Sequence, residues 1–338
     1  MNSLDVSVPT DARPTAGVAM CVYNGARYLT TQLQSIAAQS ELPRRMVVVD
    51  DGSSDGSWEL LQQWAAHSPF AVTLHRNEQN LGVARNFEKA VRMLLDEVDV
   101  VLFSDQDDQW FPQKLATLVD AFAADQGLGL IHSDAELMGP EGEPLGVRLF
   151  TALLLTDNEK ADVAAGKAYR AYVKRNLVTG AACACRSRVL ARALPFSDLW
   201  IHDEWIAFTA AMVSRVRLVD QPLMNYRLHS TNTVGLPIPN LRWWFRTVTD
   251  AFLEPQLPKQ QSRLARLLEM RRHGELLHAP VDALACLDRG IRHAQHRTSL
   301  PRGFLRRAAV VRAEWSAGQY HEWSSGRVSV LHDLLIAT

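Results

Sequence analysis

Three aspartates stand within four residues directly after an apolar run. Asp105, Asp107 and Asp108 follow residues 100–103, whose four consecutive apolar side chains are typical of a strand buried on both faces. Carboxylates so close together repel one another, and burial would raise their pKa values. A divalent cation removes that conflict, and hard oxygen ligands suit Mg²⁺ or Mn²⁺ shared with a substrate phosphate. The alternative is a solvated acidic turn in which Asp107 or Asp108 caps the next helix.

The elements that must position these carboxylates follow from the apolar pattern. Five apolar runs are typical of strands, at residues 17–22, 46–49, 72–74, 100–103 and 128–131. Apolar residues at helical spacing lie between most of them, and Pro112 is placed as the first residue of one such helix. The alternation predicts a Rossmann-like, mostly parallel α/β sheet flanked by helices. The acidic turns that follow residues 49 and 103 then share the carboxyl edge, where such sheets bind ligands.

Composition excludes several classes of protein. The net charge of −1 gives no reason to expect a nucleic-acid partner. No apolar run approaches the ~18–20 residues that span a bilayer, and no leader pattern is seen, so we expect a cytoplasmic protein. Cys183 and Cys185 alternate within an apolar run, which favours buried free thiols over a zinc site. A Gly-x-Gly-x-x-Gly motif is missing after the first strand, which argues against NAD or FAD.

Four motifs, in order, resemble the family 2 inverting glycosyltransferases, which are nucleotide-sugar enzymes of the GT-A fold. They are Tyr-Asn-Gly at 23–25, Val-Val-Asp-Asp-Gly-Ser at 48–53, Asn-Leu-Gly-Val-Ala-Arg at 80–85 and Ser-Asp-Gln-Asp-Asp at 104–108. The Asp-Gln-Asp-Asp-x-Trp form is most similar to a bacterial branch often labelled rhamnosyltransferase-like. The resemblance covers residues 17–235 and implies metal-dependent, inverting transfer from a dTDP- or UDP-sugar, with dTDP-rhamnose one candidate. It also implies a saccharide or lipid-linked saccharide acceptor, in O-antigen, capsule or other surface-polysaccharide synthesis.

The resemblance assigns donor-side roles. Tyr23 would pack on the base, and Asp51 would accept the N3–H of uracil or thymine. Asp50 is expected either at the nucleotide or bonded to its own turn. Arg85 would approach the diphosphate or the acidic cluster, unless it is a solvent-facing helix residue. Asp105 would lie near the ribose or the metal, while Asp107 and Asp108 would hold the cation that neutralises the leaving diphosphate.

The acceptor half carries the predicted base. Residues 201–205 read Ile-His-Asp-Glu-Trp and resemble the family's Glu-Asp or His-Asp segment, whose aspartate is the general base. An inverting transferase needs one carboxylate to remove the proton of the acceptor hydroxyl, so Asp203 is the candidate and Glu204 the fallback. The alternative makes Asp203 a helix N-cap and His202 a surface residue. Small residues around Gly180 resemble the segment that lines the acceptor side of the pocket.

A later segment resembles the family's Arg-x-His motif. Arg227 and His229 would close over the diphosphate, or His229 would bind the metal; a half-buried structural histidine is the alternative. The expected organisation is a loose tail (1–16), a GT-A catalytic domain (17–236, divided at 134/135) and a mainly helical extension (237–338). Residues 241–246, Leu-Arg-Trp-Trp-Phe-Arg, suit a membrane interface, which would make the protein peripheral to the inner face of the membrane; simple packing is the alternative.

Two other functions are consistent with acidic turns. A nucleotidyltransferase would also use a metal, but would normally show a Gly-rich, basic phosphate loop where residues 23–25 stand. A catalytically inactive GT-A module is the other alternative, and the complete acidic motifs and Asp203 argue against it.

Overall fold

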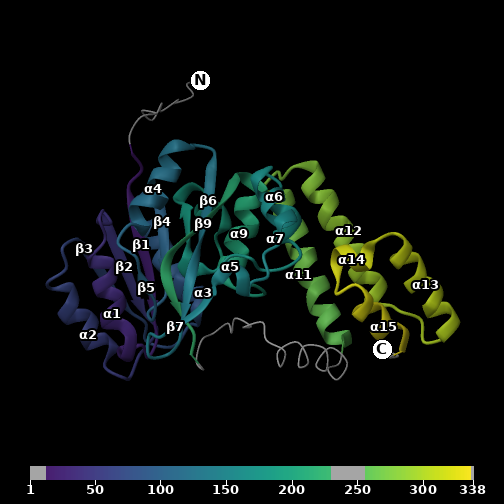
Figure 1. Cartoon of the computed structure of the whole chain (residues 1–338), viewed down its shortest axis with the longest axis horizontal. Helices are drawn as coiled ribbons and strands as arrows, with labels where there is room; N and C mark the ends of the chain where they lie inside the picture. The colour runs from purple at the N-terminus through teal and green to yellow at the C-terminus, as the bar shows by residue number, and fades with distance from the viewer. Residues whose placement is uncertain (1–12, 230–255, 336–338) are drawn as a thin grey trace.

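A mixed sheet of nine strands organises the first two thirds of the chain in the computed structural model, which describes residues 13–229 and 256–335 (Figure 1). The strands are β1 (Ala16–Val22), β2 (Arg45–Asp50), β3 (Ala71–Arg76), β4 (Val100–Ser104), β5 (Gln109–Trp110), β6 (Leu128–Met138), β7 (Pro144–Arg148), β8 (Cys183–Arg186) and β9 (Arg215–Arg227). Their order across the sheet is β3-β2-β1-β4-β8-β6-β9-β5, and β7 pairs with β6. All five predicted strands are therefore present.

The N-terminal half of the sheet is parallel, as the alternating pattern predicts. β3, β2, β1 and β4 pair in parallel, with Val22 beside Asp50 and Met20 beside Ser104. The later strands add antiparallel neighbours, because β8 runs against both β4 and β6, and β5 runs against β9. Only β6 and β9 are parallel in this half. The turns that follow β1, β2 and β4 consequently meet at one carboxyl edge.

Helices cover both faces of the sheet. Alternate residues of β1 separate the two cores: Val18 and Met20 pack with α1 (Ala26–Ala37), α2 (Ser57–Ala65) and α4 (Lys114–Ala124), whereas Ala19 packs with α3 (Val83–Leu94). Cys183 and Cys185 lie in the second core and are free, and Ala184 between them lies in the first. The remaining elements of this part are α5 (Leu149–Ala152), α6 (Asp157–Ala164), α7 (Tyr169–Tyr172), the 3₁₀ turn η1 (Gly180–Ala182), α8 (Ser187–Ala193) and α9 (His202–Val213).

Two local predictions need correction. Pro112 does not open α4, which begins at Lys114 after a turn, because the preceding residues are extended and paired with β9. The Phe111 amide donates to the Leu223 carbonyl at 2.9 Å, which continues that pairing. The first strand also starts before residue 17: Ala16 belongs to β1, and the Thr15 amide and hydroxyl both donate to Asp99 at 2.8 Å. Residues 1–12 lie outside the described part.

The C-terminal extension is helical, as expected. Its described part consists of α11 (Gln256–Leu276), α12 (Val281–Thr298), α13 (Phe304–Ser316), α14 (Gln319–Trp323) and α15 (Arg327–Leu335), which lie at the opposite end of the molecule from β3 and α2 (Figure 1). The contacts that tie it to the catalytic part include Arg266 to Glu204 at 2.5 Å, Ser197 to Glu269 at 2.7 Å and Arg192 to the Leu277 carbonyl at 2.7 Å. Within the described ranges, no helix is long and apolar enough to cross a bilayer. The predicted membrane segment at residues 241–246 lies outside the described residues.

Candidate active site

A cavity of about 700 Å³ opens at the carboxyl edge of β1, β2 and β4. Its walls come from the turns that follow these strands, from the start of α3, from η1 and the start of α9, and from the end of β9. Its polar lining includes most of the residues predicted from the sequence, together with Gln106 and Asn176: Tyr23, Asp51, Asp105, Gln106, Asp107, Asn176, Gly180, His202, Asp203 and His229. The fold therefore brings donor-side and acceptor-side residues, separated by more than a hundred positions, into one cavity.

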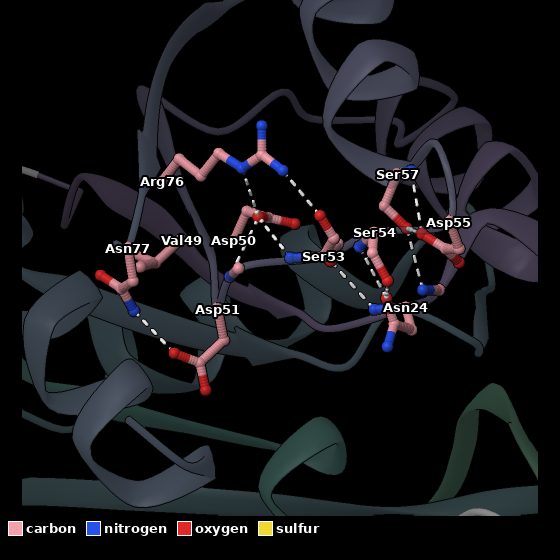
Figure 2. A network of polar contacts seen from close by, with 12 residues as sticks. Asn24, Val49, Asp50, Asp51, Ser53, Ser54, Asp55, Ser57, Arg76 and Asn77 are labelled. Atoms are coloured by element: carbon pink, nitrogen blue, oxygen red, sulfur yellow. Dashed lines mark hydrogen bonds and ion pairs between the residues drawn. The ribbon is translucent and has the colours of Figure 1, made fainter. Parts of the chain in front are cut away.

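The turn after β2 gives its two aspartates different roles (Figure 2). Asp50 is fully buried, and its Oδ1 accepts from the amides of Gly52 at 3.2 Å and Ser53 at 3.0 Å and lies 3.5 Å from Arg76 Nε. It is not among the residues that line the cavity. Asp50 was expected either at the nucleotide or bonded to its own turn, and in the structure it accepts hydrogen bonds from the backbone of that turn.

Asp51 does line the cavity, and its carboxylate organises the loop that precedes α3. Oδ1 accepts from the side-chain amide of Asn77 and from the Leu81 amide, both at 2.8 Å, and Oδ2 accepts from the Gly82 amide at 2.9 Å. A carboxylate has about four acceptor positions, so one on Oδ2 stays available to a ligand.

The turn after β4 is tied to the end of β1. The Tyr23 amide donates to Gln106 Oε1 at 2.7 Å, and Gln106 Nε2 donates back to the Tyr23 carbonyl at 3.1 Å. The Tyr23 side chain is half exposed at the mouth of the cavity, where a planar ligand could stack on it. This reciprocal pair fixes the acidic turn against the predicted base-binding residue.

Burial and mutual repulsion raise the pKa values of two carboxyl groups in the acidic cluster, Asp105 and Asp108. Burial, with the negative charges of Asp107 and Asp203, raises the pKa of Asp105 to about 7. Burial also raises the pKa of Asp108, whose Oδ1 accepts from the Arg227 amide at 3.0 Å and whose buried Oδ2 has no partner among the described groups. Asp105 and Asp107 line the cavity, but Asp108 does not.

Lys114 is a buried lysine close to this cluster that the sequence reasoning missed. Its side chain is fully buried, Nζ donates to the Ala181 carbonyl at 2.5 Å, and it lies 4.0 Å from the centre of the Trp110 ring. Burial lowers the pKa of this lysine to about 7, while Asp108 and Asp105 act in the opposite direction. The available signal was its position four residues before Leu118, on the apolar stripe of α4.

Asp203 lies on the acceptor-side wall of the cavity. Its Oδ2 accepts from the Gly180 amide at 3.0 Å and its Oδ1 from the Glu204 amide at 2.7 Å. Burial nevertheless raises the pKa of Asp203 to about 7. The N-cap position of α9 is Ile201, so Asp203 is not the cap that the alternative required. Glu204 instead pairs with Arg266 and does not line the cavity.

His202 is not the surface residue that the alternative described. It is buried in the cavity wall with its ring stacked on Phe87, ring centres 4.1 Å apart. Burial lowers its pKa to about 3, so the ring stays neutral at physiological pH. Gly180 is required here because a Cβ at that position would lie 2.8 Å from His202 Nε2.

Arg227 and His229 hold the acidic turn from the side of β9. Arg227 Nε donates to the Asp107 carbonyl at 2.7 Å, and the guanidinium lies 4.6 Å from the centre of the Tyr28 ring. Arg227 is buried and does not line the cavity. His229 does line it: Nε2 lies 2.7 Å from Asp107 Oδ2, and the ring stacks on Tyr28.

Arg85 is the predicted residue that the structure keeps away from the cavity. Its guanidinium donates to Glu88 at 2.6 Å and to the Phe196 carbonyl at 2.9 Å, and it also contacts Asp198. These partners lie on α3 and in the loop that precedes α9. The expectation that Arg85 approaches the acidic cluster is therefore not met, because two other carboxylates hold it.

The charge balance of the cavity fits a divalent cation. Four carboxylates line the cavity (Asp51, Asp105, Asp107 and Asp203), with no lysine or arginine among the described lining residues. Across residues 13–229 and 256–335, no three His, Cys, Asp or Glu side chains are arranged to hold a metal alone. Mg²⁺ and Mn²⁺ sites commonly use one or two carboxylates plus substrate phosphates, and Asp107 with His229 provides such a partial set.

Known proteins are similar to this chain in sequence and in fold. Residues 17–132 match the family described as "Glycosyl transferase family 2". A glycosyltransferase of Nostoc sp., described as uncharacterized, is 27% identical over 62% of this chain and 63% of its own length. The dTDP-rhamnosyl transferase RfbG of Shigella flexneri is 24% identical over 71% of this chain and 88% of its own.

Solved structures agree in fold. Residues 1–349 of S. aureus TarS superpose with a TM-score of 0.53 at 17% identity, covering 91% of this chain and 93% of theirs. A mannosyltransferase from Pyrobaculum calidifontis, in complex with GDP-Man and Mn²⁺, gives 0.51 at 20% identity, covering 98% and 89%. Motifs, relatives and fold agree, and residues 17–132 carry a glycosyl transferase family 2 domain.

Proposed function

We propose that this chain transfers a sugar from a nucleoside diphosphate to a hydroxyl of a saccharide acceptor, with inversion and with Mg²⁺ or Mn²⁺. The observation that carries the proposal is the charge of the cavity. Four carboxylates would repel a diphosphate, whereas a bound divalent cation would attract it. The cation would supply Lewis-acid stabilisation of the leaving diphosphate.

Residues of the cavity would bind the nucleotide, hold the cation and accept the proton of the acceptor hydroxyl. Tyr23 would stack on the base, and the available position on Asp51 Oδ2 would accept the N3–H of uracil or thymine. Asp107 and His229 would hold the cation, with Asp105 near the ribose; Asp108 and Arg227 would keep the turn in shape. A pKa of about 7 suits Asp203 to accept the acceptor's proton near neutral pH.

The setting we propose is bacterial surface-polysaccharide synthesis, with dTDP-rhamnose as one candidate donor and a saccharide or lipid-linked saccharide as acceptor. Support comes from the relative RfbG, named a dTDP-rhamnosyl transferase, and from a Bacillus subtilis relative named a putative teichuronic acid biosynthesis glycosyltransferase. The Pyrobaculum structure with GDP-Man and Mn²⁺ supports a metal-dependent nucleotide sugar site. Four free cysteines agree with the reducing cytoplasm that this role assumes.

A ligand panel tests this function. The melting temperature would be measured with UDP, dTDP, GDP and ADP, each with Mn²⁺ and with EDTA. We expect stabilisation by a pyrimidine diphosphate only when Mn²⁺ is present, and release of that nucleotide from its sugar donor by mass spectrometry. Equal stabilisation without metal, or by none of the four, would contradict the proposal.

A further inference from the structure

The C-terminal helices present large apolar side chains to solvent at one end of the extension. Phe304 and Leu305 at the start of α13 are 57% and 82% exposed, and Leu331 and Leu335 on α15 are 50% and 69% exposed. The two helices meet there, because Arg307 at the start of α13 donates to the Leu334 carbonyl on α15 at 2.9 Å. We call these four side chains, with Arg302 and Arg306, the α13–α15 surface.

These apolar side chains are not needed for the local core. α13 packs inward through Val311, which joins Leu300 and Tyr320 in a small core that also includes Val310 and Trp315. Phe304 and Leu305 lie outside that core. Single exposed apolar residues are ordinary, but a cluster at one end of a domain marks an interaction site.

In this region the acidic side chains are paired within the protein, whereas several arginine side chains are exposed to solvent. The three acidic residues between 299 and 335 all face protein partners: Glu314 bonds His293 at 2.7 Å, Glu322 lies 3.5 Å from Arg289, and Asp333 binds Arg297 at 2.6 Å. Four arginines of the same stretch are exposed, and their side chains make no hydrogen bond or ion pair within the described ranges: Arg302, Arg306, Arg312 and Arg327. The outer surface is therefore basic and apolar.

The positive charge of the α13–α15 surface favours an anionic bilayer over a second copy of the chain as its partner. A second copy of the chain would place arginines opposite arginines, which opposes association. An anionic bilayer offers phosphates at the depth of the guanidinium groups and hydrocarbon just below them. The positive end of the α13 dipole lies at the same place and adds to the attraction.

We propose that the α13–α15 surface docks the protein on an anionic membrane. The arginines contact lipid phosphates while Phe304 and Leu305 enter the interface. The docking needs neither the nucleotide site nor the metal. Membrane binding can therefore be tested separately from the proposed transferase activity.

Vesicle flotation of the full chain tests this docking. The probes are phosphatidylcholine vesicles with and without about one third phosphatidylglycerol, at low and high salt. We expect binding to the anionic vesicles alone and release at high salt. The variant Leu305→Ser/Arg306→Glu should bind at least tenfold more weakly, and so should Phe304→Ser/Arg302→Glu, which keeps the test valid if one variant misfolds.

The chain offers a matched control far from this surface. Leu42 is 42% exposed and Arg44 is exposed in the loop before β2, so Leu42→Ser/Arg44→Glu makes the same chemical change there. It should float like the parent. The proposal is overturned if the parent ignores anionic vesicles or binds neutral ones equally, or if the control loses as much binding as the variants. A variant that changes the oligomeric state in sedimentation would instead assign the surface to a second copy.

Discussion

Asp203 is held by two backbone amides and yet surrounded by low-dielectric protein. The Gly180 and Glu204 amides favour the carboxylate, but burial outweighs them and raises the pKa to about 7. A carboxylate of this kind is costly to ionise in the folded protein and more basic than one in water. Both properties can be measured.

The first prediction concerns the pH dependence of stability. Because the folded-state pKa of Asp203 exceeds its ordinary value of 3.8, its stabilising contribution is present below about pH 4 and is lost as the pH rises through about 7. Between about pH 5 and pH 8, the parent should lose about 2–3 kcal/mol of unfolding free energy more than Asp203→Asn. Urea unfolding without nucleotide or metal checks this, and parallel pH curves for the two proteins would contradict it.

Asp107 is the carboxylate best placed to bind the cation, since it lines the cavity beside His229. Asp107→Asn keeps an oxygen that can accept from His229, and Arg227 binds the main-chain carbonyl of residue 107, so the turn should stay folded. We expect Mn²⁺-dependent nucleotide binding to weaken at least tenfold, measured by metal titration of the thermal shift. The exposed Asp96→Asn is the control, and equal Mn²⁺ dependence in the two variants would remove Asp107 from the metal site.

At the scale of elements, the start of α3 depends on the turn after β2. Asp51 binds the Leu81 and Gly82 amides. Asn77, directly after β3, donates to Asp51, and Arg76 at the end of β3 donates to the Ser53 carbonyl of the same turn (Figure 2). One carboxylate thus joins three consecutive segments that form the nucleotide side of the cavity.

Asp51→Asn should loosen this loop. Both oxygens of the Asp51 carboxylate accept from N–H groups, so the side-chain NH₂ of asparagine would replace one acceptor with a donor that faces another donor. The expected cost is about 1–3 kcal/mol of unfolding free energy, with faster hydrogen exchange at the Leu81 and Gly82 amides. Glu78→Gln, an exposed change in the same loop, serves as the control. Unchanged exchange at both amides would show that Asp51 does not organise the loop.

At the scale of the whole molecule, a buried ion pair joins the C-terminal helices. Arg297 on α12 binds Asp333 on α15 through two bonds of 2.6 and 2.9 Å, and the Tyr320 hydroxyl donates to the same carboxylate at 2.8 Å. Removing one partner of a buried pair leaves a charge without compensation.

Arg297→Met should therefore destabilise the extension by about 3–5 kcal/mol, whereas Arg297→Met/Asp333→Leu should recover most of that loss. Urea unfolding and hydrogen exchange in α15 measure the effect. A double variant as unstable as the sum of its single variants would contradict the proposed coupling.

Sequence predicted the parts of the fold that depend on local pattern. Four consecutive apolar residues before Ser104 predicted β4, and strand–helix alternation predicted the parallel half of the sheet. Asp105 and Asp203 were identified by motif, and the fold places both in one cavity. The antiparallel pairing of β5 with β9 could not be predicted, because its two strands lie about a hundred residues apart.

Partners distant in sequence also decided which side chains face the cavity. Arg85 has a glycosyltransferase-like motif around it, yet Glu88, Asp198 and the Phe196 carbonyl hold its guanidinium elsewhere. Lys114 looks like any helix lysine until Ala181 from η1 is brought to it. Glu88 is a local partner, but Phe196, Asp198 and Ala181 lie 67 to 113 residues from the side chains they contact, so local sequence contains neither fact.

Asp203 provides the most direct test of the transferase account. Asp203→Asn keeps the shape of the side chain but cannot accept a proton, and a general base contributes typically ~10²–10⁴-fold to rate. The variant should bind nucleotide and Mn²⁺ like the parent and lose at least a hundredfold in sugar transfer, while Glu204→Gln keeps most activity. Transfer by Asp203→Asn at near-parent rate would show that the base lies elsewhere and would contradict the account.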